Sequence, residues 1–417
     1  MNILYIEHYA GSLEMGMEFR PYYFSREWVR MGHKVRILAA DYSHLRRKNP
    51  VIKNDFEIQM IDGIEYQWFK SKTYEGNGVK RALTMFSFVG KLKRGAKRIV
   101  NEFHPDVVIT SSTYPLDCDA GIKIAKIAKC RYVHEVHDIW PLTLTEIGGM
   151  GKHNPFVMIL ASAEKKAYNK SEAIVSVLPY TNEHIKEIGI NADDKYTYIP
   201  NGISLDDWED VLPLPEEHKE LFDKLHKENK FVIEYVGGHA LSNNLDVLLE
   251  SANKTREDKS IAYVLVGKGV EKDRLVKKAS ELELNNLYFL PPVEKKAIPS
   301  VLSNADALFI CSKKSSLYRY GISMNKVYDY MMSGKPILYG IDAKNNDVLD
   351  AKCGLYFEPE DIDELVKQIY CLKNMSKEEL KKMGENGHKW VLENCSYTEL
   401  AKEFLEILKG GKDNGKD

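Results

Sequence analysis

The 417-residue sequence lacks a charge excess, a cysteine framework and a long hydrophobic run. Its formal net charge of -2 argues against a nucleic-acid partner, because nucleic-acid-binding domains usually carry a basic excess. Its six cysteines form no CxxC pair, which leaves no pattern for a zinc site or disulfides and indicates a reducing compartment.

The longest apolar run, 156–161, is far shorter than the roughly 20 residues that span a bilayer. The start, MNILYIEHYA, has no basic flank of a signal peptide. We therefore expect a cytoplasmic protein, at most peripheral on the inner face of the cell membrane.

Short β-branched runs alternate with amphipathic helical segments along the whole sequence, the pattern of parallel βαβ units. A crossover helix is predicted over 19–31, ended by Gly32. The predicted fold is α/β, with two doubly wound Rossmann-like domains facing a central cleft. Strands are predicted at 3–6, 35–39, 107–110, 132–136, 173–177 and 196–199, and then at 231–236, 262–266, 287–290, 307–310 and 336–339.

Two domains are expected because this length exceeds what one core usually supports. The polar stretch 206–229, with Pro213 and Pro215, suits a linker that runs into a helix. We place an N-terminal domain at 1–205 and a second at 206–390. The remainder, 391–417, is predicted to be a C-terminal helix and a disordered tail.

Two glycine-bearing turns follow predicted strands in the second half. Gly238 and His239 come after 231–236, and Lys268 lies between Gly267 and Gly269 after 262–266. A strand-to-helix turn with glycine lets the backbone approach a ligand, and the helix start that follows favours phosphate. One such turn only indicates tight packing, but two on neighbouring strands favour a diphosphate site.

The segment 321–336 places polar groups at a predicted helix start. Ser323, Asn325 and Lys326 lie at or just before this start, and Asp329 lies one turn inside it. Such a helix start suits an anion, and the acid suits ribose hydroxyls. An N-capped surface helix with a solvated lysine fits the spacing equally well.

The first half offers a loop and a strand end. The loop from Gly11 to Gly16 is too long and irregular for a GxGxxG fingerprint, which argues against an oxidoreductase. His137 and Asp138 end the predicted strand 132–136, and Asp138 suits a residue that positions or deprotonates an acceptor hydroxyl. A structural role is predicted for His134 and Glu135, since alternation along a strand argues against a metal site.

Two further patterns have competing interpretations. The DxD pairs at 117–119 and 361–363 resemble a metal motif, but we predict that both are helix-start residues, so no metal is expected. The segment 79–100 has no acidic residue and an apolar helical period, which favours contact with an anionic membrane over an ordinary crossover helix. Its basic residues are Lys80, Arg81, Lys91, Lys93, Arg94, Lys97 and Arg98.

Motifs along nearly the whole chain resemble the family-4 retaining glycosyltransferases of the GT-B fold. The resemblance is strongest to the branch that builds bacterial surface polysaccharides, including N-acetyl-fucosamine transferases. The motifs are GMEFRPYYFSREWVRMGHKV (16–35), HDIWP (137–141), IPNGI (199–203), YVGGHALSNNLD (235–246), LVGKGVEKDRL (265–275), NNLYFLPPV (285–293) and SMNKVYDYMMSGKPI (323–337).

This resemblance implies a donor site in the second domain. The base of a UDP-sugar would lie against Pro292 and Val293, and Asp329 would take the ribose. The diphosphate would meet the Gly238–His239 turn with Lys268, Ser323, Asn325 and Lys326, and Gly11–Gly16 would close over the donor. No cofactor or metal is implied, because lysines and a helix start neutralise the leaving diphosphate.

The resemblance also implies the acceptor and the reaction. Asp138 and His137 would face a polyprenyl-diphosphate-linked or saccharide acceptor. The sugar would be a hexosamine, N-acetylated and in this branch 6-deoxy, transferred with retention by front-side attack. A diphosphate oxygen would accept the proton, so no enzyme nucleophile is needed.

Two departures keep alternatives open. Many relatives have two glutamates where this chain has Gly321 and Asp329, and basic residues where it has Leu241, Ser242 and Asn243. Loss of the first glutamate keeps open a non-catalytic subunit of a polysaccharide complex. A UDP-N-acetylglucosamine 2-epimerase-like isomerase shares the two-domain architecture and also stays open.

Overall fold

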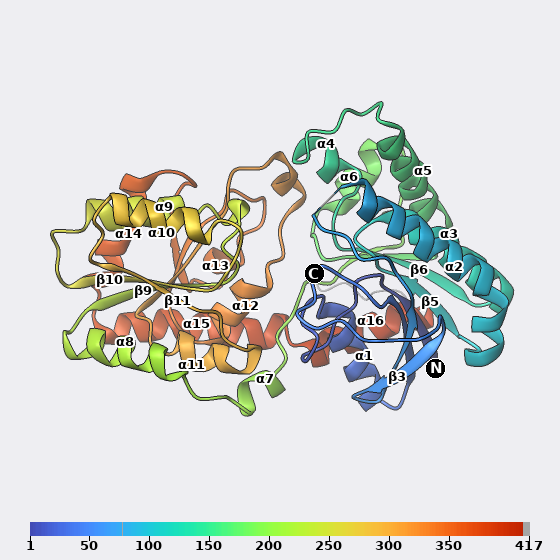
Figure 1. Cartoon of the computed structure of the whole chain (residues 1–417), viewed down its shortest axis with the longest axis horizontal. Helices are drawn as coiled ribbons and strands as arrows, with labels where there is room; N and C mark the ends of the chain where they lie inside the picture. The colour runs from blue at the N-terminus through green and yellow to red at the C-terminus, as the bar shows by residue number, and fades with distance from the viewer. Residues whose placement is uncertain (77, 412–417) are drawn as a thin grey trace. The chain divides into compact units, whose positions relative to one another are not determined.

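The computed structural model describes residues 1–76 and 78–411, which form two compact units (Figure 1). The N-terminal unit comprises Met1–Asn201, the short segment Arg319–Ser323 and the end of the chain from Tyr397. The C-terminal unit comprises Gly202–Tyr318 and Met324–Ser396.

The N-terminal unit is built on an 8-stranded sheet in the order β3-β4-β2-β1-β5-β6-β7-β8. All neighbours pair in parallel except β3 and β4, which form an antiparallel hairpin at the edge. The strands are β1 (Asn2–Ile6), β2 (Lys34–Ala40), β3 (Glu57–Ile61), β4 (Ile64–Phe69), β5 (Val107–Thr110), β6 (Arg131–Val136), β7 (Ala173–Ser176) and β8 (Tyr196–Tyr198).

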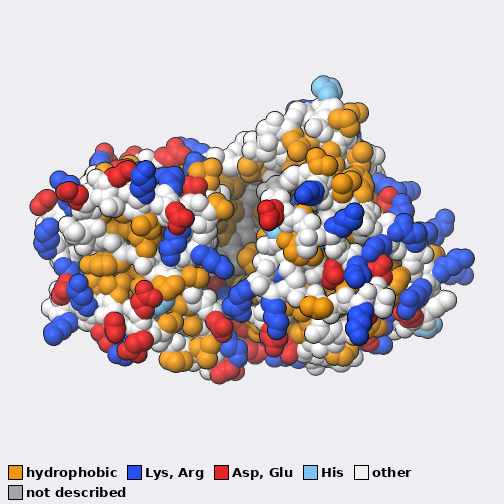
Figure 2. Space-filling model, in the orientation of Figure 1, with side chains coloured by type: hydrophobic (Ala, Val, Ile, Leu, Met, Phe, Trp, Pro, Cys, Tyr) orange, Lys and Arg blue, Asp and Glu red, His pale blue; other side chains and the backbone are white. Residues whose placement is uncertain are grey.

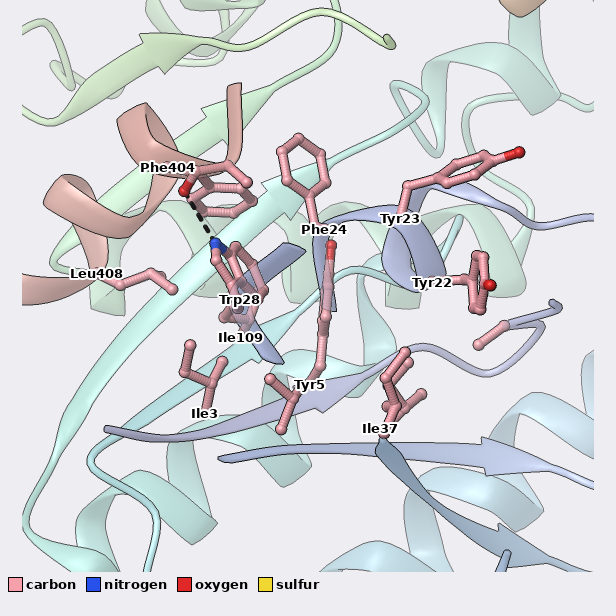
Figure 3. Packing of buried hydrophobic residues seen from close by; sticks show 14 of the residues in the cluster. Ile3, Tyr5, Tyr22, Tyr23, Phe24, Trp28, Ile37, Ile109, Phe404 and Leu408 are labelled. Carbon is pink, nitrogen blue, oxygen red and sulfur yellow. Dashed lines mark hydrogen bonds between the residues drawn. The ribbon is translucent and has the colours of Figure 1, made fainter. Parts of the chain in front are cut away.

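Helices cover both faces of this sheet, and each face has its own hydrophobic core. The final helix α16 packs beside α1 on one face, where the ring of Phe404 lies edge-on against Phe24 and Trp28 (Figure 3). Trp28 Nε1 donates to the Ala401 carbonyl at 2.9 Å. The helices are α1 (Arg20–Arg30), α2 (Val79–Phe103), η1 (Pro115–Asp117), α3 (Cys118–Ala128), α4 (Leu142–Glu146), α5 (Pro155–Lys170), α6 (Thr181–Glu187), η4 (Ser316–Tyr320, shared with the C-terminal unit) and α16 (Tyr397–Lys409).

The C-terminal unit has a fully parallel 6-stranded sheet in the order β11-β10-β9-β12-β13-β14. Helices α9, α10 and α14 lie on one face and α8, α11 and α15 on the other (Figure 1). The strands are β9 (Phe231–Val236), β10 (Ile261–Val266), β11 (Leu287–Leu290), β12 (Ala307–Cys311), β13 (Ile337–Gly340) and β14 (Gly354–Tyr356).

The helices of this unit follow the crossovers between its strands. They are α7 (Asp206–Glu209), α8 (Glu216–Lys227), η2 (Leu241–Asn243), α9 (Asp246–Lys254), α10 (Lys272–Glu281), η3 (Lys295–Ala297), α11 (Ile298–Leu302), α12 (Asn325–Met332), α13 (Asp347–Asp350), α14 (Ile362–Lys373) and α15 (Lys377–Asn394). Among the described residues, no helix is both long and apolar enough to cross a membrane.

The predicted fold class is confirmed, and every predicted strand is present within one or two residues of its limits. The hairpin β3–β4 and the short strand β14 were not predicted. The hairpin turn is Asp62-Gly63, with φ of 49° and 80°, which is the Asp-Gly turn typical of two-residue hairpins. The strand β3 was missed because it lies at the sheet edge with an exposed middle, so it lacks a buried run.

A short break separates α15 from α16, the last helix of the described chain. Ile203 pairs with the break, donating its backbone N–H to the Cys395 carbonyl at 2.7 Å. The domain limits 1–205, 206–390 and 391–417 stay a prediction. The tail predicted to be disordered includes 412–417, which lie outside the described residues.

Replacing Phe404 with Ala should destabilise the N-terminal unit by about 3–5 kcal/mol, because a buried aromatic ring leaves a cavity between α1 and α16. Urea unfolding followed by tryptophan fluorescence measures this loss. Lys402→Ala on the same helix removes only an exposed ion pair and should change the free energy by less than about 1 kcal/mol. Equal effects of the two substitutions would contradict the described packing of α16.

Candidate functional site

Two side chains and one backbone hydrogen bond hold the turn after β9. Its Gly238 carbonyl accepts hydrogen bonds from the Tyr235 hydroxyl at 2.7 Å and from Asn243 Nδ2 at 2.8 Å. The backbone N–H of His239 donates to the Lys268 carbonyl at 2.9 Å, which ties this turn to the one after β10. The two glycine-bearing turns therefore lie side by side, as the sequence predicted.

Packing explains most of the glycines in these turns, but not Gly238. A Cβ on Gly267 would lie 1.9 Å from the Gly237 carbonyl oxygen, and one on Gly269 would lie 2.3 Å from that of His239. At Gly238 a Cβ would meet only the Lys268 carbonyl, at 4.0 Å. The backbone is thus open where a side chain on Gly238 would lie.

Lys326 reaches the same turn from the first turn of α12. Its Nζ donates to Asn243 Oδ1 at 2.8 Å and to the Tyr235 hydroxyl at 3.0 Å, and it lies 4.9 Å from the centre of the Tyr235 ring. These partners are neutral, so burial lowers the pKa of Lys326 to about 8. The alternative of a solvated surface lysine is therefore wrong, because the ammonium is enclosed beside the Gly238 turn.

The neighbours of Lys326 on the predicted anion site are divided between the units. Asn325 is the first residue of α12, as expected for a helix start. Ser323 belongs to the N-terminal unit, where its Oγ accepts the backbone N–H of Asn201 at 3.0 Å. A shared contact of Ser323, Asn325 and Lys326 with one diphosphate stays a prediction.

Asp329 already has a charged partner that the sequence analysis missed. Both of its carboxylate oxygens accept hydrogen bonds from Lys295 Nζ at 2.6 Å. Lys295 follows Pro292 and Val293 in the loop after β11, so the ion pair joins the predicted base-binding loop to the predicted ribose-binding residue. Lys295 lies two residues beyond the NNLYFLPPV motif, but no sequence signal links it to Asp329, which is 34 residues away.

His239 has an enclosed and neutral ring. Its side chain has 0% exposure, and neither ring nitrogen has a hydrogen-bond partner among the described residues. Burial, together with Lys272 and Lys326, lowers the pKa of His239 to about 4. The ring therefore adds no positive charge to the turn at neutral pH, and its role in donor binding stays a prediction.

The loop Gly11–Gly16 in the N-terminal unit is tightly closed on itself. Gly16 has φ of 96°, and a Cβ on Gly11 would lie 1.8 Å from the Gly16 carbonyl oxygen. Arg46 Nε and the Tyr66 hydroxyl donate to the carbonyls of Ala10 and Gly11 at 2.8 and 2.6 Å. These contacts fix the loop at the carboxyl end of β1, where the sequence predicted a donor-closing loop.

A buried polar network surrounds Glu135 at the end of β6. Glu135 accepts from Arg20 Nε at 2.8 Å, from Ser111 Oγ at 2.5 Å and from the Tyr5 hydroxyl. The charge of Arg20 helps hold the pKa of Glu135 far below its usual value despite burial. His134 is likewise buried, and its Nδ1 contacts Thr110 Oγ1 at 2.9 Å. The predicted structural role of His134 and Glu135 is confirmed.

His137 and Asp138 have different surroundings. His137 Nε2 lies 2.6 Å from Ser111 Oγ and 3.2 Å from Glu135 Oε2, so it joins the buried network. The Asp138 carboxylate accepts from Thr143 Oγ1 at 2.6 Å and from Trp140 Nε1 at 3.0 Å. Asp138 also lines a groove of about 880 Å³, and its burial raises its pKa. Of the two residues, Asp138 alone lines this groove, and the role of both toward an acceptor stays a prediction.

The basic segment 79–100 forms most of α2, but acids outside the segment neutralise part of its charge. Lys91 pairs with Asp55 at 2.8 Å, Lys93 with Asp119 at 3.1 Å and Arg98 with Glu102 at 2.6 Å. The segment itself contains no compensating acid, but in the folded unit acids outside the segment pair with some of its basic residues. Membrane contact through the basic face stays a prediction with less support.

The two DxD pairs begin helices, as predicted. Asp361 caps α14 by accepting the Glu364 backbone N–H at 2.9 Å. Asp117 Oδ2 accepts the Ser112 backbone N–H at 2.9 Å just before α3. In the part of the chain that the structure describes, no three His, Cys, Asp or Glu side chains are grouped so that they could hold a metal ion.

Comparisons with known proteins agree with these two units. Residues 15–207 match the model of Glycosyltransferase Family 4, and residues 216–390 match that of Glycosyl transferases group 1. The chain is 23% identical over 304 residues to the "Putative colanic acid biosynthesis glycosyl transferase WcaI" of Escherichia coli (strain K12). That match covers 70% of this chain and 72% of the relative.

Solved structures match over almost the whole chain. Sucrose-phosphate synthase from Thermosynechococcus elongatus superposes with a TM-score of 0.75 at 13% identity, covering 98% of this chain and 99% of the other. Anabaena HepE, in complex with UDP and glucose, superposes with a TM-score of 0.66 at 15% identity and the same coverage. These likenesses confirm the expected GT-B fold.

Replacing Lys326 with Met should raise the free energy of unfolding relative to wild type. This gain should be larger at pH 7 than at pH 10, by up to about 3 kcal/mol. The lowered pKa of Lys326 penalises the folded state below about pH 8, and this penalty disappears as the pH rises past the unfolded pKa of roughly 10.4. Urea unfolding of both proteins at the two pH values measures the difference. Lys268→Met is the control, because it removes an exposed lysine from the adjacent turn. A gain that is constant or grows with pH would contradict burial of a charged Lys326.

Proposed function

We propose, from the membership of this chain in the glycosyltransferases with the GT-B fold, that it transfers a hexosamine from a UDP-sugar to a lipid-linked or saccharide acceptor. The reaction retains the anomeric configuration and serves surface polysaccharide synthesis. The observation that carries this proposal is the buried ammonium of Lys326 beside the open backbone at Gly238.

A diphosphate explains the surroundings of Lys326. A buried cation with only neutral partners is costly, and an anion that binds beside it repays that cost. The first turn of α12, where the N-cap residue Met324 makes no side-chain capping hydrogen bond, presents backbone N–H groups next to Lys326. In the transfer step these groups would stabilise the charge that develops on the leaving diphosphate.

The Lys295–Asp329 pair supports a nucleoside rather than a bare phosphate ligand. The pair fixes the Asp329 carboxylate, whose oxygens keep lone pairs for two ribose hydroxyls. It also fixes the loop that contains Pro292 and Val293, which would contact the base. UDP is proposed because Anabaena HepE, which shares the fold, was solved with UDP and glucose.

The N-terminal unit would hold the acceptor. Asp138 would orient the acceptor hydroxyl, while a diphosphate oxygen takes its proton as the new glycosidic bond forms on the face that UDP leaves. The acceptor would be a saccharide, either free or linked to a polyprenyl diphosphate. The similarity to a protein described as a colanic acid biosynthesis transferase supports this class of product.

UDP should bind the wild-type protein in EDTA, and Lys326→Ala should weaken that binding by at least about tenfold, because a charge-assisted contact is lost. Isothermal titration calorimetry with UDP, GDP and ADP measures both. Wild-type affinity should also fall as the pH rises from 7 to 9, since free Lys326 loses its proton near pH 8. Lys277→Ala, at an exposed lysine on α10, serves as the control.

Three results would redirect the proposal. If Lys326→Ala binds UDP as well as wild type does, the donor site lies elsewhere. If a UDP-N-acetylhexosamine alone gives an epimerised UDP-sugar without any acceptor, the chain is an isomerase. If UDP binds but neither epimerisation nor transfer to any supplied acceptor is detected, the non-catalytic subunit becomes the better reading.

A further inference from the structure

A large groove opens in the N-terminal unit between the start of α2, helix α4 and the start of α5. Its volume is about 880 Å³, and most of the residues along it are apolar. A groove of this size and composition is typical of a site for an organic ligand. The apolar lining comprises Leu45, Val79, Ala82, Leu83, Met85, Phe86, Trp140, Leu144, Ile147, Met150, Phe156 and Ile159.

Several of these apolar side chains are exposed, although they lie together. Val79 is 77% exposed, Leu83 61% and Ile147 62%. Exposed apolar side chains also gather over α4 and its neighbours in the surface view (Figure 2). Contiguous exposed apolar surface on a folded unit usually marks a binding site.

One end of the groove is polar and holds a fixed cation. Arg81 lines it, with its guanidinium 5.2 Å from the Tyr9 ring centre and 5.7 Å from that of Trp140. Asp138 and Thr143, which are hydrogen-bonded to each other, line the same groove. The other titratable groups on the lining are Glu18 and His44. Burial raises the pKa of both Glu18 and Asp138.

We propose that this groove binds the hydrocarbon chain of a lipid diphosphate acceptor, with the diphosphate at Arg81 and the sugar at Asp138. The inference rests on the transferase function proposed above and selects a lipid-linked acceptor over a free saccharide. A free saccharide would leave the exposed apolar side chains of α2 and α4 without a partner. The lipid chain instead covers them, and the cation at the polar end matches the negative headgroup.

The test compares two allylic diphosphates that differ only in chain length, the five-carbon dimethylallyl and the fifteen-carbon farnesyl diphosphate. Calorimetry with the full chain should give a farnesyl affinity at least about tenfold higher, because each buried methylene adds to binding. The double variant Leu83→Gln, Ile147→Gln should lose most of this advantage and keep the dimethylallyl affinity. Both positions are largely exposed, so the fold should persist.

Met60→Gln is the matched control, since Met60 is 60% exposed on the edge strand β3, away from the groove. It should bind both diphosphates as wild type does. Equal affinities of wild type for the two diphosphates would overturn the inference. So would a double variant that binds neutral phosphatidylcholine vesicles less well yet keeps its farnesyl diphosphate affinity, because the patch would then insert into bilayers instead.

UDP binding, measured on the same samples, separates this inference from the proposed function. UDP binding without any chain-length dependence would overturn the groove alone. Chain-length-dependent binding without UDP binding would leave the groove as a lipid site and overturn the donor site.

Discussion

A positive charge buried without a negative partner is the constraint on which the C-terminal unit depends. Lys326 needs Asn243 and the Tyr235 hydroxyl to satisfy its donors, and both also hold the Gly238 carbonyl. The cation, the turn and the first turn of α12 are therefore one arrangement, and moving any part disturbs the others. Such an arrangement costs stability in the free protein and is useful only if an anion completes it.

The N-terminal unit uses buried charge in the opposite way. Glu135 is fully buried, more deeply than the half-buried Lys326, and Arg20, Tyr5 and Ser111 donate hydrogen bonds to it. A network of this kind fixes geometry, because removing one partner would leave an uncompensated charge in the interior. It ties the start of α1 to β6 and holds His137 in place. This network gives Asp138 and the groove a rigid support in the N-terminal unit. The C-terminal unit, in contrast, contains a positive charge without a negative partner.

The sequence predicted most of what depends on local pattern. Strand runs, the start of α12 at Asn325 and the helix-start role of Asp361 all follow from residue types at short spacing. It could not predict the partners of charged groups, because these come from elements distant in sequence. Asp55 and Asp119 neutralise lysines of α2, and Lys295 occupies Asp329. A run of basic residues in a sequence therefore predicts a positively charged surface only if no acidic residue from another element pairs with it in the folded protein.

Helix α2 shows a further limit, which concerns hydrophobic periodicity. Its buried stripe includes Met85, Phe88 and Leu92 and packs against the sheet, as one amphipathic period predicts. Val79, Leu83 and Phe86 repeat at the same spacing on another face, within the first turns only, and line the groove. The hydrophobic periodicity of the sequence does not distinguish these two stripes. The sheet can cover only one face of a helix, so a second apolar stripe needs another partner. In α2 the groove, and not the basic face, provides the place for that partner.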